Sequence, residues 1–208
     1  MQSPTINEYH NFLRTRRSIR RFAPAPVPAS VIDRILATAT FAPSAHNLQP
    51  WRFVHTESMG AKERLGKALT EKMRTDMEAE NADPAQTRTE RRRSIQKRTE
   101  ISLKRITEAP IIILLCRDET VIRKDEPEEH HMGIQSTVLA GLQLMLAAHA
   151  EGLGTNWICW PLYAQTETQD ALDLPGSWLP EAMFFLGYPD ETPKETFRKS
   201  VKELLTIK

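Results

Sequence analysis

An anion-binding pattern stands near the start of the chain. Residues 16–22 read Arg-Arg-Ser-Ile-Arg-Arg-Phe, which places four guanidinium groups and one hydroxyl group close together. A guanidinium group can pair with two phosphate oxygens at once, and a serine hydroxyl adds a neutral donor. The segment therefore predicts a site for a phosphorylated ligand. The alternative is a solvated surface, where runs of arginine are common.

A second polar segment follows at residues 42–51. It contains Ser44, Asn47 and Gln49 and closes with Pro50 and Trp51. Hydroxyl and amide groups can pair with the carbonyl and imide edge of a planar heterocycle. The segment is therefore a candidate ring-binding loop, and its plainer interpretation is an ordinary turn before a strand.

Several common motifs are missing from the sequence. There is no Gly-x-Gly-x-x-Gly element and no P-loop, so arginines would have to hold a phosphate. Ser44 has no evident base, which argues against acyl transfer. The pair at residues 130–131, two histidines, lacks spaced partners, so we expect no metal site. Gly152 and Gly154 are most simply explained as glycines that end a helix.

Alternating helices and strands are expected to position these segments. Apolar periodicity predicts helices at 31–39, 59–76 and 133–150, the first with a capping box formed by Ser30 and Asp33. Strands are expected at 51–56, 109–116, 157–159 and 183–186, with 109–116 at the centre of the sheet because it is continuously apolar. A break is expected at 81–84. The charged stretch 87–105 indicates an exposed helix or a partly mobile excursion, and the tail from Val201 an arm or edge strand.

Composition is consistent with one ordinary domain spanning residues 1–208. The chain has 208 residues, of which 40% are hydrophobic, and a formal net charge of +1. That charge gives no general attraction to nucleic acid or membranes, so neither is expected as a partner. Cys116 and Cys159 lie far apart, which favours a reducing, cytoplasmic setting over a disulfide framework. The N-terminus lacks signal-peptide features, and no apolar run is long enough to span a membrane.

The order and separation of the two polar segments resemble the FMN-dependent nitroreductase family. Its chains carry an Arg-x-Ser-x-Arg element followed by an Ala-Pro-Ser-x-x-Asn-x-Gln-Pro-Trp element. Residues 152–158 look like the family's strand beside the flavin ring, and 185–189 with 198–199 look like its C-terminal element. The likeness extends from Phe12 to Leu204. Residues 172–175 and the charged middle region are most similar to the flavin domain associated with the deazaflavin-coenzyme glutamyl ligase.

The resemblance implies a fold and an assembly. The fold would be the three-layer α/β/α nitroreductase fold of the α+β class, with a mixed, largely antiparallel central sheet flanked by helices. A charged helical excursion would occupy about 75–107. The helix at 133–150 would form the centre of an intertwined homodimer with FMN at the subunit interface.

The resemblance also implies roles for single residues. Arg16, Arg17 and Ser18 would hold the phosphate and ribityl chain, closed by Arg198 or Lys199. Arg20 would lie at the pyrimidine end of the ring, where a fixed cation stabilises negative charge, and is the catalytic candidate. The loop that approaches FMN from the second subunit would comprise Pro43, Ser44, Ala45, Asn47 and Gln49. The segment along the ring would comprise Trp157, Ile158, Cys159 and Trp160.

Two departures from the family pattern bear on the acceptor pocket. Ala45 stands where the family often has serine, and Cys159, Trp160 and Pro161 replace smaller residues, which could narrow the pocket. Core packing is the plainer interpretation of Trp157 and Trp160. The plainer interpretation of Arg198 and Lys199 is a solvated pair on the surface.

The implied function is an FMN-dependent oxidoreductase. It would transfer hydride from NAD(P)H or a similar donor to an electron-poor acceptor such as a nitroaromatic, a quinone, an enone or a deazaflavin precursor. One alternative is a non-catalytic flavin-binding sensor or carrier in which Trp160 blocks access. Another is an oxygen-dependent enzyme that fragments its own flavin. A nucleic-acid-binding domain using the arginines of 14–21 and 88–98 would bind with a steep salt dependence.

Overall fold

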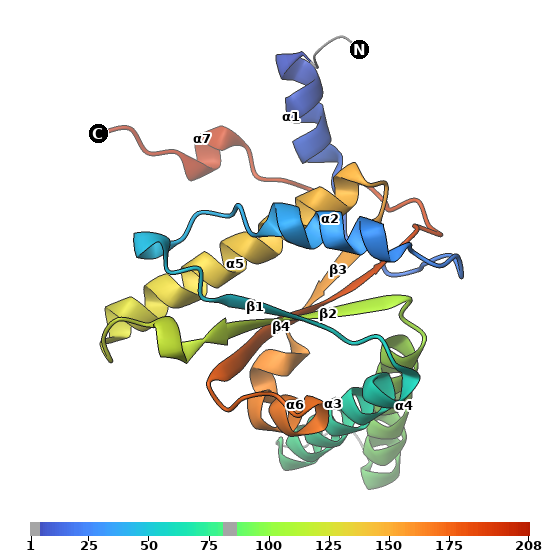
Figure 1. The fold of residues 1–208 in the computed structure, drawn as a ribbon. Coiled ribbons are helices and arrows are strands. Elements are labelled where there is room, and N and C mark those ends of the chain that lie inside the picture. Colours follow the sequence, from blue (N-terminus) through green and yellow to red (C-terminus); the bar gives the residue numbers. More distant parts are fainter. Residues whose placement is uncertain (1–4, 81–86) are drawn as a thin grey trace.

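A four-stranded sheet forms the middle layer of the molecule (Figure 1). The computed structural model describes residues 5–80 and 87–208, so the expected break at 81–84 lies outside it. The order of the strands is β1-β2-β4-β3, and each neighbouring pair is antiparallel. Their bounds are β1 Trp51–His55, β2 Ile111–Asp118, β3 Gly154–Ile158 and β4 Trp178–Gly187.

The continuous apolar run of β2 explains its central position, as predicted. All eight residues of β2 are buried. Ile113 and Leu115 face one core, whereas Ile112 and Leu114 face the other. Successive side chains of a strand point to opposite faces, so a strand covered on both sides is apolar on both of its faces, here from Ile111 to Cys116. The last two buried residues, Arg117 and Asp118, are paired with Glu181 and Arg52.

Helices cover both faces of the sheet and complete three layers (Figure 1). One face carries α2 (Ala29–Ala39) and α5 (Pro127–Ala150), whose buried Ile35 and Leu144 share a core with Phe184 of β4. The other face carries the helices α3 (Met59–Ala79), α4 (Arg88–Thr107) and α6 (Gln165–Leu172). The prediction of a three-layer α/β/α fold with a largely antiparallel sheet is confirmed.

The capping prediction for α2 is wrong. The helix begins at Ala29, and its N-cap residue is Pro28, which makes no side-chain capping bond. The extended conformation of Pro28 directs the chain into the helix two residues earlier than a Ser30 cap would require. Ser30 therefore lies inside the first turn, while Ile32 and Ile35 are buried as the periodicity predicted.

The charged stretch after residue 86 forms a helix. Thr87 caps α4, and its backbone N–H donates to the Glu90 carboxylate at 2.9 Å. Ile95, Ser102 and Ile106 are buried, since this face of α4 packs on α3. The part of the expected excursion at 81–86 lies outside the described residues.

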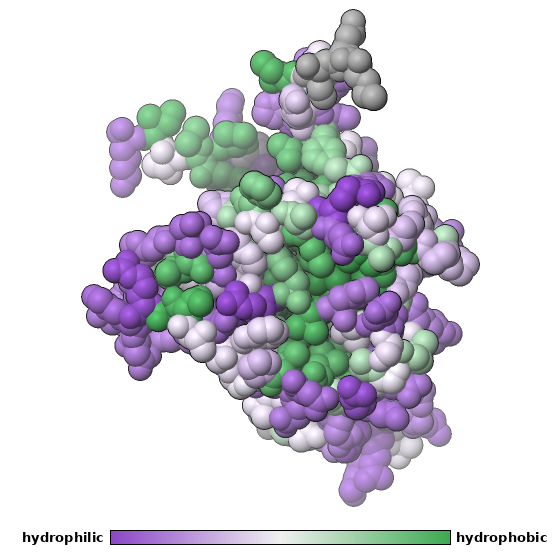
Figure 2. All heavy atoms as spheres, in the orientation of Figure 1, coloured by the Kyte–Doolittle hydropathy of each residue, from purple (hydrophilic) through white to green (hydrophobic). Residues whose placement is uncertain are grey.

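Two terminal elements project from the body (Figure 1). Neither α1 (Ile6–Thr15) nor α7 (Val201–Leu204) has a buried residue. Figure 2 shows apolar residues along the tail that carries α7, where Phe197 is 82% and Ile207 is 86% exposed. The described tail contains a short helix, so the edge-strand alternative for it is wrong.

Three short 3-10 helices lie between the longer elements of the described chain. They are η1 (Ala45–Asn47), η2 (Glu119–Val121) and η3 (Trp160–Tyr163). None of the helices in the described ranges combines the length and the apolar character needed to cross a membrane.

Candidate functional site

The arginine-rich segment runs extended along the outer edge of β3. The Ile19 backbone N–H donates to the Thr155 carbonyl at 2.9 Å, and Ser18 forms a parallel bridge with Thr155. Ile19 is buried, whereas its neighbour Arg20 is exposed. A Cβ at Gly154 would lie 2.6 Å from Ile19, so this glycine permits the close approach.

The two glycines after α5 therefore differ in role. Gly152 has φ of +76°, directly after the helix, which agrees with the predicted helix-ending role. Gly154 belongs to β3, so the same prediction for Gly154 is wrong. This glycine makes room for Ile19 rather than ending the helix.

The segment that follows β4 returns beside the arginines. The Ala23 N–H donates to the Tyr188 carbonyl at 2.9 Å, and the Asp190 N–H donates to the Arg21 carbonyl at 3.0 Å. The Arg17 guanidinium donates to the carbonyl of Lys194. These bonds hold residues 188–194 against the arginine-rich segment.

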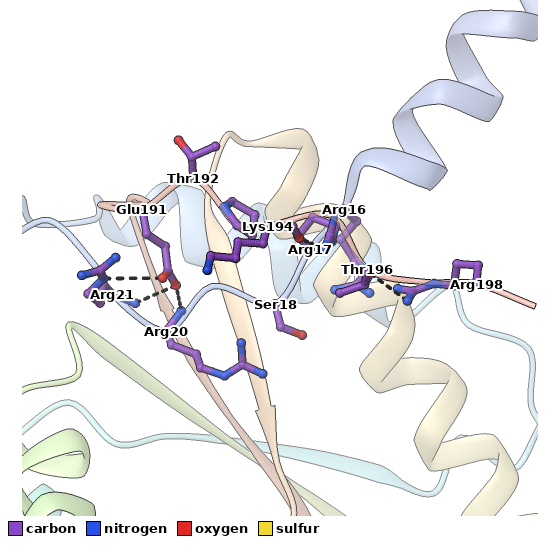
Figure 3. Close-up of a pocket in the computed structure, with 11 residues that line it drawn as sticks. Arg16, Arg17, Ser18, Arg20, Arg21, Glu191, Thr192, Lys194, Thr196 and Arg198 are labelled. Carbon is purple, nitrogen blue, oxygen red and sulfur yellow. Dashed lines mark hydrogen bonds and ion pairs between the residues drawn. The ribbon is translucent and has the colours of Figure 1, made fainter.

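The two segments enclose a strongly basic hollow of about 420 Å³ (Figure 3). Five arginines and one lysine face a single carboxylate among the described residues that line it. The lining residues are Arg16, Arg17, Ser18, Arg20, Arg21, Glu191, Thr192, Pro193, Lys194, Thr196 and Arg198. Burial, together with the charges of Arg198 and Arg17, lowers the pKa of Arg16. An anionic ligand would relieve this crowding of positive charge.

The C-terminal cation that lines this hollow is Arg198. Its guanidinium donates to the Thr196 hydroxyl at 2.8 Å. Lys199 is exposed and is not among the lining residues. Of these two alternatives for closing the phosphate site, only Arg198 is brought together with Arg16, Arg17, Ser18 and Arg20.

A second hollow, of about 290 Å³, shares Arg20 and Arg21 with the first. It also includes Arg105, from the last turn of α4, which the sequence analysis missed. Burial and the positive charge of Arg20 lower the pKa of Arg105. The Arg105 guanidinium lies 5.9 Å from the centre of the Trp160 ring. In the sequence, Arg105 is one of many basic residues of this helix, so its type alone did not mark it as a site residue.

The predicted ring segment divides between β3 and the turn after it. Trp157 packs edge-on against Phe184, with ring centres 4.9 Å apart, and its indole N–H donates to the Cys159 sulfur at 3.2 Å. Ile158 is buried in the opposite core. Cys159, expected in the strand, is exposed and lies beyond it, and Trp160 begins η3. The Trp157 side chain is thus used in the core, as its plainer interpretation held.

The predicted ring-binding loop is an ordered structure with an unusual backbone. His46, Asn47 and Gln49 have φ of 51°, 56° and 50°, in the left-handed region that non-glycine residues seldom occupy. The Gln49 N–H donates to the Ser44 hydroxyl at 3.1 Å. The Ala45 N–H donates to the hydroxyl of Ser136 on α5, also at 3.1 Å. Such strained backbone persists only where its surroundings hold it.

An ion pair holds the far end of this loop. The Arg52 guanidinium donates to the Gln49 carbonyl at 3.2 Å and lies 2.7 Å from an oxygen of Asp118. Burial opposes ionisation of Asp118, but hydrogen bonds from Thr120 and the charge of Arg52 hold the pKa of Asp118 below its ordinary value. Arg52 is therefore paired with a carboxylate that stays ionised at neutral pH.

The ring-binding loop lies away from the basic hollow. Pro43, Ser44, Ala45, Asn47 and Gln49 are absent from the lining of both hollows. The loop and the arginine-rich segment stand at opposite ends of α2, a helix of 11 residues (Figure 1). Such a helix is about 16 Å long. The structure therefore does not bring the two predicted parts of the site together within one subunit.

Comparison with known proteins is consistent with this geometry. The nitroreductase family model matches residues 13–188. A 5,6-dimethylbenzimidazole synthase of Rhodospirillum rubrum is 34% identical over 184 residues, covering 85% of this chain and 79% of the relative. A Bacillus subtilis protein whose name ascribes NAD(P)H nitroreductase activity to it is 29% identical, covering 94% and 92%.

A solved structure shares the fold. It is oxidised iodotyrosine deiodinase bound to FMN and 3-iodo-L-tyrosine, which superposes with a TM-score of 0.71 at 23% identity. The superposition covers 96% of this chain and 97% of that one. The specific likeness to the deazaflavin-coenzyme ligase domain stays a prediction. Because the family model spans most of this chain, the chain belongs to the nitroreductase family of flavin-dependent oxidoreductases.

Proposed function

We propose that the protein is an FMN-dependent oxidoreductase that transfers hydride from a reduced nicotinamide to an electron-poor small molecule. The observation that carries this proposal is the basic hollow beside β3, which shares Arg20 and Arg21 with the second hollow. Bound FMN would supply the hydride chemistry, and the protein would supply position and charge. A reducing, cytoplasmic setting suits such a reaction.

The donor set of the first hollow fits a phosphate group. Arg16, Arg17 and Arg198 are planar cations that can each pair with two phosphate oxygens, and Ser18 adds a hydroxyl donor. Six cationic side chains and one carboxylate are among the residues that line this hollow, so the positive charge that crowds Arg16 is not neutralised there. A dianionic phosphate would offset part of this positive charge, so we assign these four residues to the phosphate end of FMN.

The second hollow suits the pyrimidine end of the ring. Arg20 and Arg105 come from segments far apart in the sequence, yet both line it. Two fixed cations there would stabilise negative charge that develops on the ring during hydride transfer. Arg20 is therefore the catalytic candidate, and Arg105 would act beside it.

A homodimer would complete the site. The loop at 43–49 lines neither hollow in this subunit, but a loop from a second subunit could reach the ligand. Val138, Leu139 and Leu142 are apolar residues of α5 that remain about 40% exposed. Burying such residues against a second copy is favourable. We therefore propose that FMN binds at a subunit interface and that the loop acts across it.

The absorption spectrum of the purified protein tests the proposed function. We expect the visible spectrum of bound FMN, identified by mass after release, and bleaching on anaerobic addition of NADH or NADPH. Repeated turnover with a small quinone would distinguish an enzyme from a sensor or carrier, which would be reduced once at most. A colourless protein that takes up no added FMN would overturn the proposal.

An oxygen-dependent enzyme that fragments its own flavin is the second candidate. It is favoured by the 34% identity to a 5,6-dimethylbenzimidazole synthase, because that product contains the dimethylbenzene unit found in flavin. The test is to reduce the FMN-bound protein without oxygen, admit air and measure FMN by chromatography. Recovery of all the FMN would exclude this candidate, whereas progressive loss would support it.

A further inference from the structure

A single carboxylate, that of Glu191, lines the otherwise basic hollow among the described residues. One oxygen of Glu191 accepts hydrogen bonds from the backbone N–H groups of Arg20 and of Arg21, the second at 3.1 Å. Its other oxygen lies 3.5 Å from Nε of Arg21. The Glu191 side chain is 17% exposed and that of Arg21 is 76% exposed, so the carboxylate lies beneath the outer arginine.

These contacts hold the side chain of Arg21, but not that of Arg20, beside Glu191. Figure 3 shows the Arg21 guanidinium on the side of Glu191, whereas the Arg20 side chain extends away from the carboxylate and beneath Ser18. The Asp190 N–H donates to the Arg21 carbonyl at 3.0 Å, which fixes the next peptide unit along the chain. The backbone at Arg20 and Arg21 is thus held by three bonds from two consecutive residues.

We propose that Glu191 is a positioning residue for the flavin site. It binds the backbone of residues 20 and 21 and takes Arg21 as its partner, which leaves the Arg20 guanidinium directed to the hollow shared with Arg105. This inference rests on the proposed function, since it assigns Glu191 a part in placing the catalytic candidate. Glu191 itself would not contact the reacting atoms.

The ionisation state of Glu191 agrees with this role. The hydrogen bond from the Arg20 backbone, followed by those from Arg21, holds the pKa of Glu191 below its ordinary value. The group is therefore an acceptor at neutral pH. A protonated carboxyl group would be a weaker acceptor for two N–H groups.

The opposite role for Glu191 predicts opposite results. If Glu191 only placed a negative charge beside an anionic cofactor, removing it would tighten FMN binding and raise the flavin midpoint potential. If Glu191 positions Arg20, removing it weakens binding and lowers the potential, because the cation is no longer fixed. The sign of the change distinguishes the two roles.

The experiment compares three single variants with the wild-type dimer. We expect Glu191→Ala to raise the Kd for FMN about tenfold, equivalent to about 1.4 kcal/mol, and to make the midpoint potential more negative. Glu191→Gln retains an acceptor oxygen, so its Kd should stay within about threefold of wild type. Glu195→Ala removes an exposed carboxylate from the same segment and should match wild type in both quantities.

A double-mutant cycle assigns the effect to Arg20. In an Arg20→Ala background, Glu191→Ala should cause little further change in the potential, because the two residues act together. If Glu191→Ala does not fold, Glu191→Asp takes its place, since it keeps the charge but is too short to hold both N–H groups. It should lower the potential in the same way.

Two sets of results would overturn the inference. Unchanged or tighter FMN binding with an unchanged or raised potential in Glu191→Ala would do so and leave the proposed function standing. Failure of wild-type protein to bind FMN would overturn both.

Discussion

Arg20 and Arg105 illustrate how the site depends on single residues from separate parts of the chain. Arg20 follows the first helix, and Arg105 lies in the last turn of the fourth, yet both line one hollow. The effect of Arg20 on the pKa of Arg105 reflects this proximity. Each guanidinium would be costly to place beside the other without an anionic ligand, which is why their pairing points to function.

Replacing Arg16 and Arg17 together tests the phosphate role. We expect the Arg16→Ala, Arg17→Ala variant to lose FMN affinity, since each charge-assisted hydrogen bond contributes about 1.5–3 kcal/mol. Fluorescence titration with FMN would measure the loss. Arg14→Ala, an exposed arginine of α1 that does not line the hollow, is the matched control. Tight FMN binding by the double variant would contradict the assignment.

The two cysteines are expected to differ in reactivity. Burial, followed by the charge of Glu181, raises the pKa of Cys116 to about 12, so its thiol stays protonated and inert. Cys159 is exposed. A thiol reagent should therefore modify one group in the folded flavin-free protein and two after unfolding, counted by mass spectrometry. Cys159→Ser should leave none in the folded state. Fast labelling of Cys116 would contradict the packing of β2.

The sequence predicted most residues of the basic hollow but not those that arrive through tertiary packing. Arg16, Arg17, Ser18 and Arg20 are adjacent in the chain, so their spacing alone brings them together. Arg105 could not be distinguished from other basic residues of α4, because only the packing of that helix on α3 selects it. Glu191 and Lys194 depend in the same way on where the chain runs after β4.

At the scale of elements, the type of each helix and strand was easier to predict than its ends. The apolar run of β2 and the periodicity of α2 follow from burial, which the sequence records directly. The start of β3 at Gly154 depends on its pairing with β4, where Gly154 lies opposite Gly187. The start of α2 depends on the extended conformation of Pro28. Pairing with a distant strand and the conformation of one cap residue leave little trace in apolar periodicity.

The close packing of α5 on the sheet gives a prediction for Gly141. A Cβ there would lie 2.6 Å from the Trp157 ring and 3.0 Å from Leu115 and Phe184. Gly141→Ala should therefore lower the free energy of unfolding by about 1–3 kcal/mol, measured by urea denaturation. Gly60→Ala, in the first turn of α3 with no atom within 4 Å of the added Cβ, should not destabilise the protein. Equal stability of the two variants would contradict this packing.

At the scale of the molecule, many of the exposed apolar side chains in the described part of the chain gather in three regions. They are the outer residues of α5, the helix α1 and the tail that carries α7. α1 is attached to the body through stacking of Phe12 on His149, with ring centres 4.9 Å apart. Large exposed apolar surfaces usually mark sites of association. The proposed homodimer would account for all three.

A charge at Leu142 tests the proposed homodimer. We expect Leu142→Asp to give insoluble or flavin-free protein, because the substitution places a carboxylate where a second α5 would pack. Size-exclusion chromatography with light scattering and the visible spectrum would report on assembly and flavin content. Ile101→Asp, at a half-exposed apolar residue of α4 on the other face of the sheet, is the control and should behave as wild type. A soluble monomer that retains FMN would contradict the shared site.

The bond between Ile19 and Thr155 has a consequence for aggregation. β3 is an outer strand of the sheet, and its free backbone groups would otherwise offer a template to other chains. The arginine-rich segment covers that edge and surrounds it with positive charge. A substitution that displaces the backbone of this segment should therefore promote self-association through β3, whereas one that shortens only its side chains should not. A substitution that displaces the backbone would then abolish both FMN binding and solubility. One that shortens only an arginine side chain would weaken FMN binding and leave the protein soluble.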